Sequence, residues 1–282
     1  MDQFATNRIF LETEAALCKK HPERVHQLEL VRSIASLKAK ARCYQLPTDV
    51  DRLAREAGII AIRIVSLTTR GRLLREPGGY VVELDSKLSL NQRRFVIAHE
   101  ISHLLVEKDL MLTTFGRPQR SKTRHYFVEK LCDFGAREIL LPINSLRNEI
   151  AGLSPSLETV CKLSEEAHCS FELTAERICE SPSIWDGCRF ISWTTHKGRL
   201  LAVRTWPERG VDPEQIILKD EKNSVVMRAL NTASVAKDWQ ELSYAGREQE
   251  TVYLEAVASE EGYVLALRLF KQPPRKVVRP LK

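Results

Sequence analysis

The chain has 282 residues, of which 43% are hydrophobic and 28% charged, and its formal net charge is +6. The apolar content is ample for a packed core, and the length is more natural for two domains than for one. No apolar run approaches the length of about 20 residues that a membrane-spanning helix needs. The first residues, Met1–Phe4, contain an early acid and no apolar signal segment, so we expect a cytoplasmic protein.

The distribution of the basic residues and cysteines argues against two further classes, proteins with a basic DNA-binding face and proteins built on a disulfide framework. Five cations lie in the last twelve residues, which contain no acid, and residues 1–270 therefore carry only +1. A basic DNA-binding face is not indicated; residues 271–282 are predicted to be a flexible, solvated basic tail, with weak binding of acidic partners or nucleic acid as the alternative. The seven cysteines are scattered without a C-x-x-C pair, which favours reduced thiols over a disulfide framework.

The first ninety residues predict three helices followed by two strands. Apolar residues at helical spacing mark the helices, and β-branched content marks the first strand. Glycines end the third helix and turn the chain between the strands. The predicted helices span residues 10–19, 25–42 and 47–57, and the predicted strands span residues 59–65 and 80–84.

A single H-E-x-x-H motif, His99 to His103, lies in an apolar stretch that predicts a helix over residues 93–105. Two imidazoles four residues apart lie on one face of a helix, about 5–6 Å apart at Cβ, so both can reach one metal ion. Glu100 can contact a metal-bound water without being a ligand. The alternative is a buried helix with two hydrogen-bonded histidines, in which every buried polar group needs a partner.

A third metal ligand is expected downstream, because zinc in hydrolytic sites usually takes three protein ligands and leaves one position for water. Residues 107–124 predict a polar loop, either solvated or a mobile flap. Glu129 and Asp133 follow it at i, i+4 spacing, so a helix would present both on one face. Glu129 is the predicted ligand, and Asp133 is predicted to accept the free ring N–H of a ligand histidine. His125 and Glu138 are rival ligands, and a solvated acidic face is the alternative for the pair.

These groups together would form a hydrolytic centre. A metal held by two imidazoles and one carboxylate lowers the pKa of a bound water towards about 7. Glu100 would act as general base, accepting the proton as the water attacks a peptide carbonyl and later passing it to the leaving amine. His125 or Tyr126 could supply a second electrophile. Residues 79–85 could form an edge strand that pairs with an extended substrate, although an ordinary structural strand is equally expected.

Two segments resemble the ImmA/IrrE family of metallopeptidases. Residues 94–105, R-F-V-I-A-H-E-I-S-H-L-L, are similar to the family pattern R-F-x-x-A-H-E-x-x-H-L-L. Residues 129–142, E-K-L-C-D-F-G-A-R-E-I-L-L-P, are similar to E-x-x-C-N/D-x-F-A-x-E-L-L-x-P. Gly135 stands where the family usually has Phe, so we expect a core contact to be lost or replaced by the neighbouring Phe134. Ser102 stands where Gly is frequent, and we expect this to be a mild change at an outer position. The resemblance covers residues 25–180, and no predicted metal position departs from it.

The resemblance implies a zinc-dependent peptidase of the α+β class, with a mainly helical, zincin-like core and a small sheet. It also implies a protein substrate, a helix-turn-helix transcriptional repressor, whose cleavage derepresses phage, mobile-element or stress genes. The ligand types themselves admit Mn²⁺ as well as Zn²⁺.

The chain beyond Pro142 predicts three helices, at residues 144–151, 156–167 and 171–180. The last two have a helix-turn-helix-like arrangement, but the second carries several acids and is a poor surface for phosphate, which favours plain packing. Alternating residues after 183 predict a small α+β or mainly β domain. Some family members carry a GAF-like sensor domain at this place, so the resemblance offers a GAF-like fold as one expectation for this domain, although no residue pattern here supports a ligand.

The predicted organisation has five parts. They are an N-terminal extension at 1–24, a metallopeptidase domain at 25–150, a helical segment at 151–183, a C-terminal domain at 184–270 and the basic tail at 271–282.

The leading hypothesis is a zinc endopeptidase that cleaves a repressor. The alternative is a non-proteolytic regulatory metal- or DNA-binding protein that acts through its C-terminal domain. An intact Glu100 argues against a purely structural metal, which would also need a fourth ligand, and Cys132 is the only nearby thiol. DNA binding is weakly supported, and no membrane association is expected.

Overall fold

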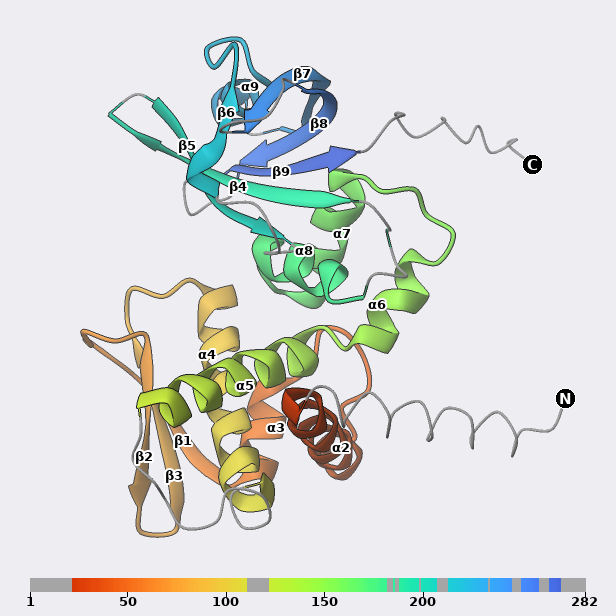
Figure 1. Cartoon of the computed structure of the whole chain (residues 1–282). Coiled ribbons are helices and arrows are strands. Elements are labelled where there is room, and N and C mark those ends of the chain that lie inside the picture. Colours follow the sequence, from red (N-terminus) through yellow and green to blue (C-terminus); the bar gives the residue numbers. More distant parts are fainter. Residues whose placement is uncertain are drawn as a thin grey trace, which may run out of the picture. The chain divides into compact units, whose positions relative to one another are not determined.

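The computed structural model describes residues 22–110, 122–181, 185, 188–197, 199–206, 213–232, 234–244, 250–258 and 264–269. The chain forms two compact units, Met1–Pro142 and Ile143–Lys282 (Figure 1). The predicted helix at 10–19 and the basic tail at 271–282 lie outside the described residues. The five-part organisation expected from the sequence stays a prediction.

The first unit contains helices and a small sheet, as expected for the α+β class. The sequence predicted neither strand β2 nor the helical turn at residues 106–110. The loop predicted at 107–124 is helical at 107–110 and 122–124, and residues 111–121 lie outside the described residues. The elements are α2 (Pro22–Ala41), α3 (Val50–Ala57), β1 (Ile59–Val65), β2 (Gly71–Glu76), β3 (Gly79–Asp85), α4 (Leu90–Leu105), the π-helical turn η1 (Val106–Leu110) and α5 (Lys122–Leu140).

The sheet of the first unit has the strand order β1-β3-β2. Strand β3 pairs in parallel with β1 and antiparallel with β2. The hypothesis that residues 79–85 form an edge strand is therefore wrong, because β3 is hydrogen-bonded on both sides. The edges belong to β1 and β2, and β2 lies against α4 because Gly71, without a Cβ, allows the close approach of Val96.

Local signals at the helix ends fix where α4, the helix that carries the H-E-x-x-H motif, begins. Ser89 caps α4 by accepting a hydrogen bond from the Gln92 backbone N–H, and the Gln92 side chain accepts one from the Ser89 backbone N–H. This reciprocal capping box satisfies two donors that the first turn would otherwise leave unpaired. Gly58 ends α3 in the left-handed region, with a φ of 101° that residues with a side chain adopt only with strain.

Helices α4 and α5 cross closely where two small residues meet. Ser102 is fully buried, and its hydroxyl donates to the Ala98 carbonyl at 2.9 Å. A Cβ on Gly135 would lie 2.5 Å from Ser102 Oγ and 2.9 Å from Leu30 Cδ2. The expectation that Ser102 occupies an outer position is wrong, because its side chain faces α5 across this crossing.

The far end of α5 is tied to the rest of the unit by hydrogen bonds to its last carbonyls. Lys38 Nζ, on α2, donates to the Ile139 carbonyl at 2.8 Å, and Thr48 Oγ1 donates to the same oxygen at 2.8 Å. Both side chains are buried. They satisfy a carbonyl that helix ends leave without an internal partner, and they hold α5 at one end while the Gly135 crossing fixes its middle.

The second unit is a six-stranded antiparallel sheet with helices. The three helices predicted at 144–151, 156–167 and 171–180 and the strand-rich region predicted after residue 183 are all present. The elements are α6 (Ile143–Ile150), α7 (Leu157–Ala167), α8 (Phe171–Cys179), β4 (Arg189–His196), β5 (Arg199–Trp206), the 3-10 turn η2 (Pro213–Gln215), β6 (Ile216–Leu218), α9 (Val225–Thr232), β7 (Ala236–Tyr244), β8 (Glu250–Ala258) and β9 (Val264–Leu269).

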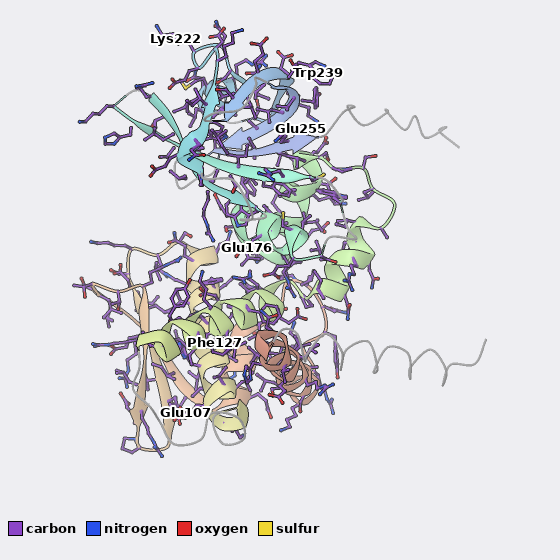
Figure 2. The ribbon with its side chains drawn as sticks, in the orientation of Figure 1. Glu107, Phe127, Glu176, Lys222, Trp239 and Glu255 are labelled. Atoms are coloured by element: carbon purple, nitrogen blue, oxygen red, sulfur yellow. The ribbon has the colours of Figure 1, made fainter. Side chains whose placement is uncertain are left out.

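The strands of this sheet run in the order β5-β4-β9-β8-β7-β6. Helix α9 packs on one face, where its Val225, Val226 and Ala229 join the apolar core. Helix α7 contacts β8, where the buried Glu255 (labelled in Figure 2) accepts a hydrogen bond from the Leu157 backbone N–H at 2.7 Å. A carboxylate at this first turn satisfies a helix-end donor and complements the helix dipole.

Helix α8 is not a free recognition helix. It contacts β4, β5 and α7, and most of its side chains, including Arg177, are buried. A DNA reader of the helix-turn-helix type needs its second helix exposed to enter the major groove. Burial of α8 agrees with the packing role that its acidic sequence favoured.

Gly135→Ala is expected to destabilise the first unit. Overpacking at the crossing costs about 1–3 kcal/mol of unfolding free energy, which outweighs the gain of about 1 kcal/mol from Ala over Gly in a helix. All four tryptophans lie between residues 185 and 239, in the second unit. Urea unfolding followed by circular dichroism, which reports both units, should therefore show a lower unfolding free energy for the variant. The transition followed by tryptophan fluorescence, which reports the second unit, should be unchanged.

The matched control is the double variant Ser102→Gly/Gly135→Ala. Removing the hydroxymethyl group makes room for the new methyl, so most of the loss should be recovered. A Gly135→Ala protein that is as stable as the unmodified chain would mean that α4 and α5 do not approach this closely.

Candidate metal centre

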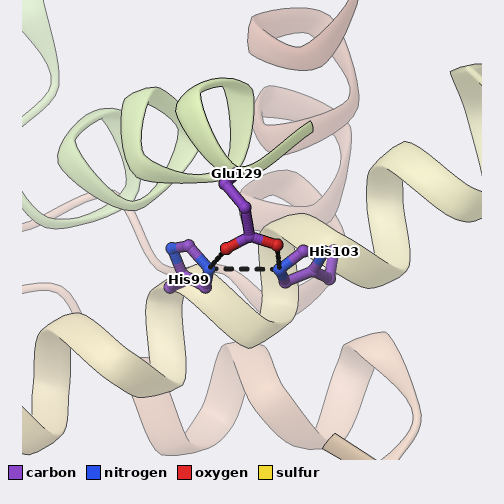
Figure 3. A group of neighbouring side chains, drawn as sticks. All are labelled: His99, His103 and Glu129. Atoms are coloured by element: carbon purple, nitrogen blue, oxygen red, sulfur yellow. Dashed lines mark hydrogen bonds and ion pairs between the residues drawn. The ribbon is translucent and has the colours of Figure 1, made fainter. Parts of the chain in front are cut away.

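The side chains of His99 and His103 on α4 meet Glu129 on α5 (Figure 3). The two Nε2 atoms are 3.1 Å apart. One Glu129 oxygen lies 3.4 Å from His99 Nε2, and the other lies 3.4 Å from His103 Nε2. The structure therefore brings together the three residues that the sequence analysis selected as ligands, from two helices separated by a long connection.

These separations fit a zinc ion. Zinc binds nitrogen and carboxylate oxygen at about 2.0–2.1 Å, and tetrahedral geometry then places neighbouring ligand atoms about 3.3–3.4 Å apart. The three measured separations are close to that value. Ordinary polar contacts have similar distances, so the distances alone do not indicate a metal. The kinds of side chain do, because two imidazoles and a carboxylate converge on one point.

Asp133 contacts one of the two histidines, His99, at the ring nitrogen that does not face Glu129. Its Oδ1 lies 3.0 Å from His99 Nδ1, the ring nitrogen opposite the one that faces Glu129. This contact keeps Nδ1 protonated and leaves Nε2 free to bind a cation. The predicted role of Asp133 thus has the geometry it requires.

Burial and the carboxylates act in opposite directions on the two imidazoles. Burial alone would lower both pKa values, but for His99 the hydrogen bond and charge of Asp133 outweigh it and raise the pKa. The pKa of His103 is lowered by burial and by the neighbouring charge of His99. For Asp133, burial is outweighed by the contact with His99, which keeps its pKa below the usual range. The Asp133–His99 contact therefore stabilises the ionised carboxylate.

Glu100 lies beside the ligand group and not in it. Its side chain is 8% exposed, and burial raises its pKa above the usual value. Beside the ligand group is a cavity of about 330 Å³, which is lined by Glu100 together with His99, His103 and Glu129. A carboxyl group with a raised pKa in such a cavity is suited to accept and then release a proton.

The rival ligands do not join the group. His125 lies with Nδ1 3.7 Å from Glu129, but its side chain is 79% exposed and it does not line the cavity. Glu138 is buried elsewhere on α5, and Tyr126 is exposed with Lys130 over its ring. Neither His125 nor Tyr126 is placed as the second electrophile that the sequence suggested.

Cys132 is not positioned as a fourth ligand. It is fully buried, burial raises the pKa of its thiol, and it is absent from the ligand group found in the described part of the chain. The described residues would therefore supply three ligands to a metal, and the cavity that these ligands line would leave room for a water molecule. That arrangement is typical of catalytic rather than structural zinc sites.

The wall of the cavity that faces the candidate metal ligands could not be recognised from the sequence. Residues 70–73, at the start of β2, line the cavity together with Phe95 and Val96. Two of them, Arg70 and Arg72, are cationic. Their only sequence signal was a polar, charged run after the first strand, which is also the pattern of a loop.

Comparison with known proteins finds a family match over the region that carries the site. Residues 54–178 match the IrrE N-terminal-like domain, the model of the peptidase M78 family. The radiation response metalloprotease IrrE of Deinococcus deserti is 27% identical over 96 residues. That alignment covers 34% of this chain and 34% of the relative, so this chain matches about a third of the relative's length.

A solved structure shares the fold more widely. A Mycobacterium tuberculosis transcriptional regulator aligns with 85% of this chain and 74% of its own, with a TM-score of 0.52 and 18% identity. At this identity the similarity concerns the fold alone. Separately, no helix within the described residues is long and apolar enough to cross a membrane.

Asp133→Asn is expected to weaken zinc binding about 10–100-fold, because losing the charged acceptor behind a ligand histidine has that effect in other sites. Glu129→Gln, which removes a ligand charge, should weaken binding further. Competition with a chromophoric chelator measures both affinities. His125→Ala is the matched control and should retain the affinity of the unmodified chain. Unchanged affinity in Glu129→Gln would mean that another residue completes the site.

The family match at residues 54–178 contains the H-E-x-x-H helix and the Glu129–Asp133 helix. Its metallopeptidase relatives imply a bound metal, and the His-His-Glu group provides a place for one. Residues 54–178 of the chain are therefore similar to the IrrE N-terminal-like domain of the peptidase M78 family, and this region contains the whole candidate metal centre.

Proposed function

We propose that the protein is a metal-dependent endopeptidase, with Zn²⁺ as its metal and Mn²⁺ as the possible substitute. One observation carries the proposal: two imidazoles and a carboxylate converge beside a buried Glu100, and all four line one cavity. A structural metal site would not need an additional acid aimed into an open cavity. A zinc ion in this place would polarise a peptide carbonyl and make a water molecule acidic enough to react at neutral pH.

Residues of the chain would transfer the proton, orient the ligands and hold the helix in place. Glu100 takes the proton of the attacking water and then gives it to the leaving amine, a role for which its raised pKa is suited. Asp133 fixes the ring of His99, so that its Nε2 keeps facing the cavity. Buried apolar residues of α4 on either side of the motif hold the helix in place.

Strand β2 is the part of the sheet that could bind a peptide. It is an edge strand, and its first residues line the cavity that contains Glu100. An extended substrate could add to this edge through main-chain hydrogen bonds, which would place a peptide carbonyl near the metal ligands. Strand β2 would thus have the substrate-pairing role that the sequence suggested for residues 79–85.

The proposed substrate is a helix-turn-helix transcriptional repressor, cleaved at a limited number of bonds. This part rests on the match to the IrrE N-terminal-like domain, on the resemblance of the two motifs to the ImmA/IrrE family and on the metalloprotease name of the Deinococcus deserti relative. The geometry supports hydrolysis of an extended polypeptide in general. The repressor assignment adds a regulatory purpose, which is release of repressed genes.

Glu100→Gln is expected to reduce cleavage about 10²–10⁴-fold, the usual contribution of a general base, while zinc content stays unchanged. Cleavage of a candidate helix-turn-helix repressor can be followed by gel electrophoresis and mass spectrometry. Glu107→Gln is the matched control, because Glu107 is exposed on η1, just beyond the end of α4 (Figure 2). Retained cleavage in Glu100→Gln would remove the general-base role.

Absence of cleavage by the zinc-loaded, unmodified chain would favour the non-proteolytic alternative. Cleavage of an unrelated unfolded protein, but of no repressor, would leave the peptidase and remove the proposed substrate.

A further inference from the structure

We propose that Arg70 forms a subsite that selects an acidic side chain of the peptide substrate. This inference rests on the proposed peptidase function and names a specificity determinant for it. It starts from the wall of the cavity that faces the metal ligands, where Arg70 and Arg72 flank Gly71.

The two arginines differ in how their charge is balanced. Arg72 donates from Nε to Glu83 at 2.7 Å, and its Nη2 lies 2.6 Å from the same carboxylate oxygen. Glu83 is buried, so this pair is fixed and Arg72 has little charge to offer a ligand. Arg70 has no carboxylate partner among the described residues, and its guanidinium lies 6.0 Å from the centre of the Phe95 ring.

The carboxylates that line the cavity are already engaged. Glu129 contacts both ligand histidines, and Asp133 is held by His99. Glu100 is the proposed base. Of the cations on the cavity wall, Arg70 is therefore the one whose charge is not balanced within the described residues, and the natural counterpart is a carboxylate brought by the substrate.

The backbone of Arg70 is held where a bound peptide would pass. Its carbonyl accepts a hydrogen bond from the Asp85 N–H at 3.0 Å, which ties it to the sheet just before β2 begins. Because β2 is an edge strand, a peptide added along it would run past Arg70 on its way to the metal ligands. Stacking on Phe95 would limit the directions in which the guanidinium can turn.

The test uses peptide hydroxamates, which attach to a metal whether or not the protein hydrolyses peptides. Each series carries Glu or Gln at one position, scanned along the peptide, and binding to the zinc-loaded full chain is measured. At one position the Glu peptide should bind about fivefold more tightly than the Gln peptide, the scale of a partly exposed ion pair. The preference should shrink as salt is raised.

Arg70→Gln should abolish this preference without changing the affinity for the Gln series. Arg70→Glu should reverse it, so that a Lys peptide binds better than the Glu peptide. Arg63→Gln is the matched control: Arg63 is on β1 of the same sheet, it is paired with Glu76 at 2.6 Å, and it does not line the cavity. This variant should keep the preference.

The outcomes separate the subsite from the peptidase function. A Glu preference that depends on Arg70, in a protein that cleaves no peptide, would support the subsite and contradict the peptidase. Cleavage without a Glu preference, or with one that survives Arg70→Gln, would overturn the subsite alone. Failure of every hydroxamate to bind would overturn both, because the metal centre would be missing.

Discussion

The close crossing of α4 and α5 is the constraint on which the metal centre depends. One helix carries the two imidazoles and the other carries Glu129 and Asp133, and neither set can bind a metal alone in the proposed way. The helices approach because Gly135 has no side chain where it meets Ser102. Hydrogen bonds from Lys38 and Thr48 then hold the end of α5. The distances at the site are thus set by packing some distance away from it.

The crossing also concentrates charge in a partly buried place. Glu100, Glu129 and Asp133 lie around two imidazoles, and burial raises the pKa of Glu100 while it opposes charge on the histidines. A divalent cation would balance these carboxylates and use the lone pairs that now face one another. Metal binding and the stability of the first unit should therefore be coupled, since any ligand that binds only the folded state stabilises it.

The sequence predicted the ligand set because all of its signals are local. His99 and His103, and then Glu129 and Asp133, are i, i+4 pairs on helices, and helix geometry alone puts each pair on one face. The sequence could not show that β2 lies at the edge or that Arg70 reaches the cavity, because strand order is set by contacts between distant segments. It also misplaced Ser102, since the side of α4 that is buried depends on the neighbour supplied by α5. The α+β class and the β-rich second unit are confirmed, and most of the elements within them were predicted.

X-ray absorption at the zinc edge of the zinc-loaded full chain tests the central claim most directly. The account predicts a shell of nitrogen and oxygen atoms only, at about 2.0–2.1 Å, with the multiple-scattering signal of two imidazoles. Addition of a small hydroxamate should change this shell, because one position is open to solvent. A sulfur atom at about 2.3 Å, or a shell that the hydroxamate leaves unaltered, would contradict an open His-His-Glu site.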